Sequence, residues 1–168
     1  MLVIADASPL PYLILIASTE ILPALFGRLV IPRAVAQELR HPQTPAVVRA
    51  WMAAPPAWLD IQDVGTAADA SVAHLDPGER EAITLAQTLH ADLLVMDEWE
   101  GRREAGRRAL TVTGVLGVLE RAAQRELVDL SSALTRLLAT NFYAPTNLVR
   151  DMLARDAARK ARPWKGQI

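Results

Sequence analysis

The chain has 168 residues, of which 51% are hydrophobic and only 5% aromatic, and it contains no cysteine. This length suits a single domain with a sizeable core, and the lack of cysteine excludes disulfides, thiolate metal sites and a cysteine nucleophile. The formal net charge of −1 excludes a global basic field, so any binding of nucleic acid must come from a local patch.

An apolar stretch near the N-terminus, LPYLILIA, is similar to the core of a signal peptide. No basic residue precedes it, Asp6 interrupts the apolar run, and Pro9 and Pro11 break it further. Its uninterrupted part is about half as long as a membrane span. We therefore expect a soluble, cytoplasmic protein that does not bind membranes.

The first predicted element is a buried strand over residues 2–4, which runs into Asp6. Ser8 and Pro9 follow as the N-cap and the first residue of a helix. A carboxylate at the carboxyl end of a buried strand is costly unless it has a function. In open α/β sheets this edge is where ligands bind, so Asp6 is the first candidate site residue.

Beyond Asp6 the chain alternates apolar strands with amphipathic helices. The predicted strands cover residues 28–31, 58–64, 92–97 and 110–113. The predicted helices cover residues 9–18, 19–26 (capped by Thr19 and closed by Gly27), 32–40, 44–54, 77–90, 98–108 and 115–124, and two more precede a basic tail. This alternation favours an α/β fold with helices on both faces of a parallel sheet. We expect one main domain over residues 1–140, with a C-terminal helix and basic tail over residues 141–168 packed on it or extending it.

Four carboxylates stand where such a sheet would bring them together. Asp6 and Asp97 each follow an apolar strand, and they face each other if those strands flank the topological switch point. Glu38 lies at the border of the apolar face of its helix. At roughly 100° per residue, Glu79 lies about 50° from the centre of the apolar stripe of its helix, whereas Glu81 faces solvent.

Several carboxylates in one small site repel each other and partly protonate unless a cation compensates them. Oxygen ligands without cysteine and with few histidines select a hard cation, Mg²⁺ or Mn²⁺, rather than zinc. Ions held in this way can activate water and stabilise the leaving oxygen of a phosphodiester. The joint placement of the four acids therefore indicates a metal-dependent nuclease.

Each acid also has a purely structural interpretation. Asp6 can help to cap the helix that follows it, and Glu38 can be an ordinary glutamate of an amphipathic helix. Glu79 has the strongest alternative, because Asp76 and Glu79 have the spacing of a capping box. Asp97 can simply begin a turn.

Five segments of the chain, taken in order, resemble the signature blocks of PIN-domain proteins: DASPL, VIPRAVAQEL, LDPGEREAITLA, LLVMDEWEGRREA and LTVTGVLGVL. The resemblance is to a compact prokaryotic branch with LDxGE and DExxGR blocks, which is related to the VapC-type toxins. It implies a three-layer α/β/α sandwich around a parallel sheet of about five strands, in the order 3-2-1-4-5.

The resemblance also implies which residues carry the activity. The implied catalytic and metal-binding residues, with their polar neighbours, are Asp6, Glu38, Glu79 and Asp97, with Ser8 and Thr113. The implied activity is Mg²⁺- or Mn²⁺-dependent cleavage of RNA, usually by a homodimer, as the toxin of a pair whose antitoxin protein is encoded nearby. One departure is that the third acid of VapC-like chains is usually aspartate and is glutamate here.

Three arginines of the predicted helix 98–108 are candidates for contacts with the RNA backbone. Arg102, Arg103 and Arg107 fall within about 140° of one another on a helical wheel, and arginine is well suited to phosphate. Salt bridges to glutamates of the same helix explain them equally well. The basic tail, which includes Arg162 and Lys165, can touch RNA or a partner, or fray.

Other classes of function fit less well. A phosphoacceptor receiver domain needs a lysine after its last strand, but the only lysines are Lys160 and Lys165. A haloacid-dehalogenase-type phosphatase needs an aspartate two residues after its nucleophile, where this chain has Ser8. The alternative that remains open is a PIN-like module that binds RNA or protein with little or no cleavage.

Overall fold

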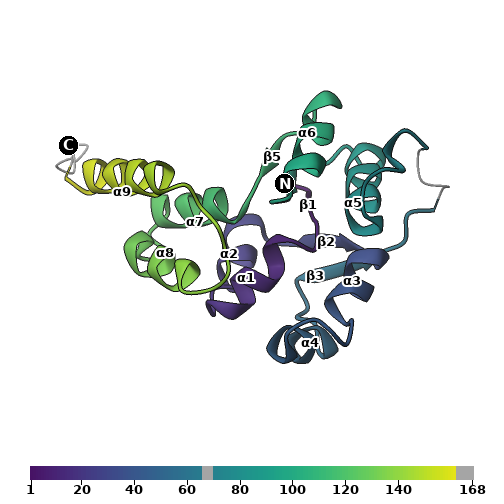
Figure 1. Ribbon diagram of the computed structural model, residues 1–168, viewed down its shortest axis with the longest axis horizontal. Helices are drawn as coiled ribbons and strands as arrows, with labels where there is room; N and C mark the ends of the chain where they lie inside the picture. Colours follow the sequence, from purple (N-terminus) through teal and green to yellow (C-terminus); the bar gives the residue numbers. More distant parts are fainter. Residues whose placement is uncertain (66–69, 162–168) are drawn as a thin grey trace, which may run out of the picture.

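The computed structural model describes residues 1–65 and 70–161. At its centre is a parallel sheet of the strands β1 (Val3–Ala5), β2 (Leu29–Pro32), β3 (Leu59–Gln62), β4 (Leu93–Val95) and β5 (Val112–Thr113). They lie in the order β3-β2-β1-β4-β5, which confirms the predicted order 3-2-1-4-5. In Figure 1 the labelled strands follow this order from β3 at the bottom through β2 and β1 to β5 at the top. The strands β3, β4 and β5 are shorter than the apolar pattern predicted.

Helices follow the strands and cover both faces of the sheet. Within the described residues they are α1 (Pro9–Leu15), α2 (Ile21–Phe26), α3 (Arg33–Leu39), α4 (Ala46–Ala53), α5 (Pro77–Thr88), α6 (Trp99–Arg107), α7 (Val115–Gln124), α8 (Leu130–Leu138) and α9 (Thr146–Lys160), with a short 3₁₀ turn at Ala70–Val72. No helix in these ranges combines the length and the hydrophobicity needed to cross a membrane. Residues 66–69, between the predicted strand 58–64 and helix 77–90, and Arg162 and Lys165 of the basic tail lie outside the described ranges.

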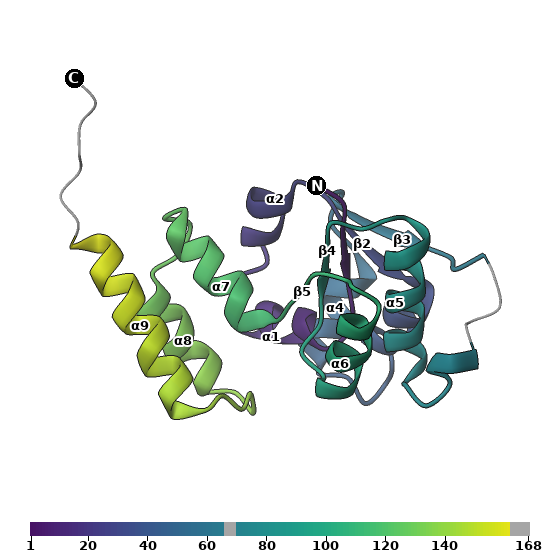
Figure 2. The same ribbon diagram turned by 90° about the horizontal axis from the view of Figure 1, so that it is seen from above.

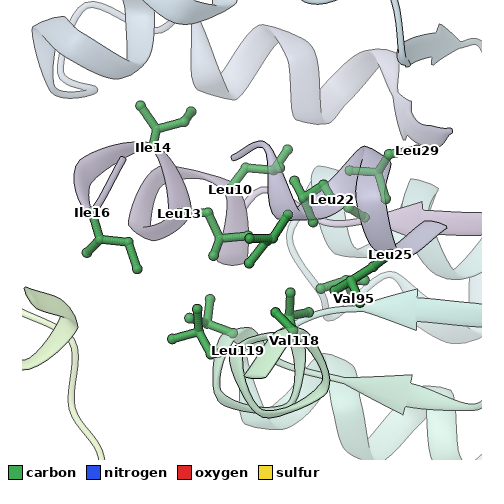
Figure 3. Packing of buried hydrophobic residues seen from close by; sticks show 14 of the residues in the cluster. Leu10, Leu13, Ile14, Ile16, Leu22, Leu25, Leu29, Val95, Val118 and Leu119 are labelled. Carbon is green, nitrogen blue, oxygen red and sulfur yellow. The ribbon is translucent and has the colours of Figure 1, made fainter. Parts of the chain in front are cut away.

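The alternation of side chains along the strands divides the core into two layers. Val3 and Ala5 belong to one buried hydrophobic cluster, with residues of α1, α2 and α7, whereas Ile4 belongs to a second cluster with residues of α5. In Figure 3, Leu13 of α1 faces Leu119 of α7 across the first cluster. These layers confirm the predicted α/β/α sandwich.

Two local predictions about the first helices are wrong. The helix α2 begins at Ile21, and the residue at its N-cap is Glu20 rather than Thr19. The helix α1 ends at Leu15 instead of residue 18, because Ala17 turns the chain with a positive φ of 52°. The end of α2 at Gly27 is as predicted, with a φ of 78° that glycine adopts without steric cost.

The helices α8 and α9 pack beside α7, on the side of the molecule away from α5 (Figure 2). Met152 of α9 is only 2% exposed and belongs to the first hydrophobic cluster, together with Leu134 of α8. The helix α9 thus shares the core of the sheet-containing part. The domain boundary at residue 140 remains a prediction.

We expect Met152→Ala to lower the free energy of unfolding by about 2–4 kcal/mol, the usual cost of truncating a buried methionine. Urea unfolding followed by circular dichroism should keep a single transition with a lower midpoint, because α9 shares one core with the sheet. Leu138→Ala is the control, since Leu138 is 43% exposed on α8 and its truncation should cost much less. Two separate transitions in the parent protein would show that α9 folds independently.

Candidate active site

The carboxyl ends of β1 and β4 bring Asp6 and Asp97 to the same edge of the sheet, as predicted. The two strands are paired, with Ala5 opposite Val95, and the backbone N–H of Asp6 donates to the carbonyl of Val95 at 2.9 Å. Asp97 follows β4 by two residues. Because β1 lies between β2 and β4, this edge is the topological switch point of the sheet.

Ser8 occupies the N-cap position of α1, as predicted, but its hydroxyl links the two aspartates. Its hydroxyl donates to Oδ2 of Asp6 at 2.9 Å and accepts the backbone N–H of Asp97 at 3.0 Å. The expected N-cap hydrogen bond from this side chain is absent from α1. The prediction of Ser8 as the N-cap residue is therefore confirmed in position, although its hydroxyl makes no capping hydrogen bond. Its supporting role at the site stays a prediction.

Glu38 and Asp6 both approach the first turn of α5 at Gly78. A Cβ atom on residue 78 would lie 3.1 Å from Oε2 of Glu38 and 3.4 Å from Oδ1 of Asp6. Because glycine has no side chain, both carboxylates can approach the backbone of α5 at this residue. Asp6 itself is 2% exposed, so one of the two charges lies inside the protein.

Glu79 has the structural role that its spacing from Asp76 suggested. Its Oε2 accepts the backbone N–H of Asp76 at 3.1 Å, which completes a capping box at the start of α5. Its other carboxylate oxygen lies against α6, where a Cβ on Gly101 would come within 2.7 Å of Oε1. The residue is 7% exposed, which agrees with the prediction that it leans toward the sheet.

The prediction that Glu81 faces solvent is wrong. Its Oε2 accepts the backbone N–H of Ala34, near the start of α3, at 3.0 Å. A helical wheel describes one helix by itself. In the fold α3 packs beside α5, and an N–H group of its first turn, which has no partner within the helix, donates to this carboxylate. Substitution of Glu81 is therefore no neutral control for Glu79.

Two adjoining cavities open at this edge of the sheet. The smaller has a volume of about 300 Å³ and includes five acids, namely Asp6, Glu38, Asp76, Glu79 and Glu98. The larger has a volume of about 640 Å³ and includes Asp97, Glu98, Arg102 and Thr113. Ser8, Tyr12, Glu98 and Asn141 line both. Asp97 and Thr113 thus line the larger cavity, whereas Asp6, Glu38 and Glu79 line the smaller one beside it.

The carboxylate of Asp97 lies at the start of α7. Its Oδ1 accepts the backbone N–H of Val115 at 3.0 Å, and its Oδ2 is 3.3 Å from the same nitrogen. Burial raises the pKa of Asp97 to about 6, although this hydrogen bond and the guanidinium of Arg102 both lower it. The carboxyl group of Asp97 therefore accepts the N–H at the start of α7 and has a pKa of about 6.

Burial and mutual repulsion act on the other three acids as well. Burial is the largest cause that raises the pKa of Asp6, and the charge of Asp76 adds to it. Burial also raises the pKa of Glu38 and Glu79, and in both cases the charges of Asp6, Asp76 and Glu98 raise it further. The acids are thus close enough for each to disfavour the charge of the next.

The carboxylates suit a hard divalent cation by their chemistry, because all of their donor atoms are oxygens. In the described residues, however, no group of three or more His, Cys, Asp or Glu side chains is gathered closely enough to hold a metal ion. Glu79 and Asp97 instead bind backbone N–H groups. The donor set therefore fits such an ion, and ligation by all four predicted acids requires their side chains to move.

Of the three predicted RNA-binding arginines, only Arg102 lines either cavity. Its Nη1 donates to the carbonyl of Met96 at 2.8 Å. Arg103 lies over the ring of Trp99, with its guanidinium carbon 4.5 Å from the ring centroid, and Arg107 contacts Glu104 at 3.4 Å. Arg103 and Arg107 are thus exposed and have partners on α6. The salt-bridge interpretation holds for Arg107, whereas Arg103 stacks on an aromatic ring.

The cavity residues that were not predicted as site residues include Tyr12, Asp76, Glu98 and Asn141. Asp76 was considered only as a cap, and Glu98 only as a partner for arginines, although its position directly after Asp97 was a usable signal. Tyr12 and Asn141 gave no signal, because they reach the site from α1 and from the connection between α8 and α9.

We predict that Asp97→Asn makes the metal-free protein more stable at neutral pH. A carboxyl group whose pKa rises from 3.8 to about 6 on folding contributes stability that is complete below pH 3.8 and is lost as the pH rises through about 6. Asparagine does not titrate and can still accept the N–H of Val115. The melting temperature in EDTA should therefore exceed that of the parent by roughly 2–5 °C at pH 7.5 and converge with it toward pH 4.

The control for this measurement is Asp151→Asn, which changes an exposed carboxylate on α9 and should follow the parent at every pH. A difference between Asp97→Asn and the parent that does not vary with pH would contradict the raised pKa.

Comparison with known families supports the resemblance to PIN domains. A family model described as a PIN domain matches residues 2–157, which is nearly the whole chain and includes most of α9. A comparison with curated proteins gives no match. With this match and the 3-2-1-4-5 sheet, the chain belongs to the PIN-domain family.

Proposed function

We propose that this protein is a divalent-metal-dependent ribonuclease whose activity rests on Asp6, Glu38, Glu79 and Asp97. PIN domains are typically metal-dependent nucleases, so the nuclease class follows from the family. The observation that carries the proposal for this chain is the buried Asp6 carboxylate, which opens into a cavity with four further acids. Negative charge gathered in this way is stabilised most directly by a cation.

Each residue has a distinct role in the proposal. Asp6, Glu38 and Glu79 hold the ion, Mg²⁺ or Mn²⁺, and Asp97 completes the set from the adjoining cavity. The ion supplies Lewis-acid activation of water and compensates the charge of the phosphodiester. Ser8 orients the carboxylate of Asp6 through its hydroxyl.

Arg102 is the residue proposed to position the RNA backbone. It lines the larger cavity and lies close enough to Asp97 to lower the pKa of that carboxyl group. A guanidinium in this place can hold a phosphate beside the acids. Arg103 and Arg107, which line neither cavity, are left with at most peripheral contacts to RNA.

The direct test is cleavage of a mixed pool of RNA oligonucleotides with and without metal. We expect cleavage with Mg²⁺ or Mn²⁺, complete loss in EDTA and recovery when excess Mn²⁺ is added back. Asp6→Asn should reduce the rate at least about 100-fold, because it removes the most buried of the proposed ligands. Equal cleavage in EDTA would overturn the metal-dependent mechanism.

Glu79→Gln separates a cap from a metal ligand. Glutamine can still accept the N–H of Asp76, so the melting temperature in EDTA should stay within about 2 °C of the parent or rise slightly. A neutral amide is a much poorer ligand for a hard cation, so we expect far slower cleavage and weaker Mn²⁺ binding by calorimetry.

The control for Glu79→Gln is Glu20→Gln, since Glu20 is exposed at the start of α2 and lines neither cavity. It should cleave and melt like the parent. Full cleavage by Glu79→Gln would restrict Glu79 to its capping role.

The biological role proposed for this nuclease is that of a toxin, and it rests on the resemblance to VapC-type proteins. In this proposal the protein acts in the cytoplasm as a homodimer, and an antitoxin encoded nearby covers the acidic cavities. Expression should then arrest growth, and the arrest should disappear with Asp6→Asn or with co-expression of the neighbouring gene. Arrest that persists with Asp6→Asn would separate toxicity from cleavage.

A second candidate, a PIN-like module that binds RNA or protein without cleaving it, is favoured by one observation. The carboxylates of Glu79 and Asp97 both accept hydrogen bonds from backbone N–H groups at the starts of helices. Under this alternative the two acids are purely structural. RNA that binds but is not cleaved with either metal, at any pH between about 6 and 9, would support it.

A further inference from the structure

The connection between α8 and α9, residues 139–145, forms a wall of the site although it is far from the acids in sequence. The ring of Phe142 packs edge-on against that of Tyr12 in α1, with centroids 4.9 Å apart and planes at 83°. The backbone N–H of Phe142 donates to Oγ1 of Thr140 at 3.1 Å, which folds the connection on itself. Figure 1 shows this segment passing beside α1. It is therefore anchored where it meets the two cavities.

Two neighbours of Phe142 present unused binding groups at these cavities. Asn141 lines both of them, and an amide side chain can donate and accept hydrogen bonds at once. Tyr143 lines the larger cavity and yet is 84% exposed. Leu148, on the first turns of α9, lies in the same lining and is also exposed. An aromatic ring, an amide and an apolar side chain thus line the same cavity as Asp97.

The charges around the larger cavity select the kind of group that can enter it. Glu98 and Glu120 line it together with Arg102 and Arg155, and Arg155 is paired with Glu120 at 2.8 Å. A second phosphate at this end would meet a paired arginine and two glutamates. An uncharged, flat group with polar edges fits this lining better, and the volume of about 640 Å³ lies in the range of small-ligand sites.

We propose that Tyr143 and Asn141 bind one unpaired nucleobase of the RNA, next to the bond that the acids cleave. Tyr143 stacks on the face of the base and Asn141 hydrogen-bonds to its edge, as aromatic and amide side chains do in single-stranded RNA recognition. A paired base hides both its face and its edge, so the site takes single-stranded RNA. The inference rests on the proposed function and names the part of the substrate that the nuclease reads.

The test measures binding without cleavage. All variants are made in an Asp6→Asn background, and fluorescence anisotropy in Mg²⁺ follows a labelled, unstructured RNA of eight nucleotides. Adding Tyr143→Ala should weaken binding about tenfold, the scale of one lost stacking contact. Adding Tyr143→Phe should keep binding within about twofold, because the ring remains. Since Tyr143 is largely exposed, neither change should lower the melting temperature.

Abasic sites identify the contacted base. Removing the base at one position should weaken binding about tenfold with Tyr143 present and leave binding to the Tyr143→Ala variant unchanged. Adding Asn141→Ala should reduce the preference among oligonucleotides that carry A, C, G or U at that position. Trp99→Ala is the matched control, since Trp99 is another exposed aromatic residue, 66% exposed, that lines neither cavity.

The outcomes separate this inference from the proposed function. Equal binding by Tyr143→Ala and its background, an equal loss in Trp99→Ala, or an abasic penalty that persists without Tyr143 would each overturn the inference while cleavage by the parent stands. The alternative is that this face binds a second copy of the chain or a partner protein. Competition by either protein with the labelled RNA to the same extent whatever its base sequence would also overturn the inference. A base-dependent effect of Tyr143 in a protein that cleaves no RNA would support the inference and reject the nuclease.

Discussion

The burial of one carboxylate at the carboxyl end of β1 is the constraint on which the site depends. Asp6 is 2% exposed, and its pKa is raised mainly because water is excluded from it. Ser8 offsets part of this cost, since both its backbone N–H and its hydroxyl donate to Oδ2 of Asp6. The same hydroxyl accepts the N–H of Asp97, so one side chain joins the ends of β1 and β4. The pairing of β1 with β4 thus fixes the position of the carboxylate that the proposed function requires.

Glycines in three of the signature blocks have a physical explanation in this arrangement. A Cβ on Gly78 would crowd Glu38 and Asp6, a Cβ on Gly101 would crowd Glu79, and a Cβ on Gly114 would collide with Asp97. Gly78 and Gly101 lie in the first turns of α5 and α6, where the helix backbones approach the carboxylates directly. The spacing of acid and glycine in LDxGE and DExxGR therefore reflects close packing at the site.

How far the sequence predicts this structure depends on whether an interaction lies within one element or between several. The strand order was predicted through the resemblance to PIN domains. The residues themselves indicated that Asp6 and Asp97 lie at the carboxyl ends of parallel strands, and that they face each other if those strands flank the switch point. The role of Glu81 was not, because its partner, the N–H of Ala34, belongs to a neighbouring helix. Asn141 was out of reach for a stronger reason. It arrives at the site only because Phe142 packs on Tyr12, a contact between aromatic rings 130 residues apart in sequence.

The capping and metal-binding interpretations of the acids compete for the same oxygen atoms, and they do so differently at Glu79 and Asp97. A carboxylate has two oxygens and about four lone-pair directions. Glu79 uses Oε2 for the N–H of Asp76, so Oε1 keeps its lone pairs for another partner. Asp97 places both oxygens near one N–H, at 3.0 and 3.3 Å, and its pKa of about 6 shows how weakly that contact compensates its burial. At Glu79 the capping hydrogen bond therefore leaves Oε1 for an ion, whereas at Asp97 an ion would share both oxygens with the N–H of Val115.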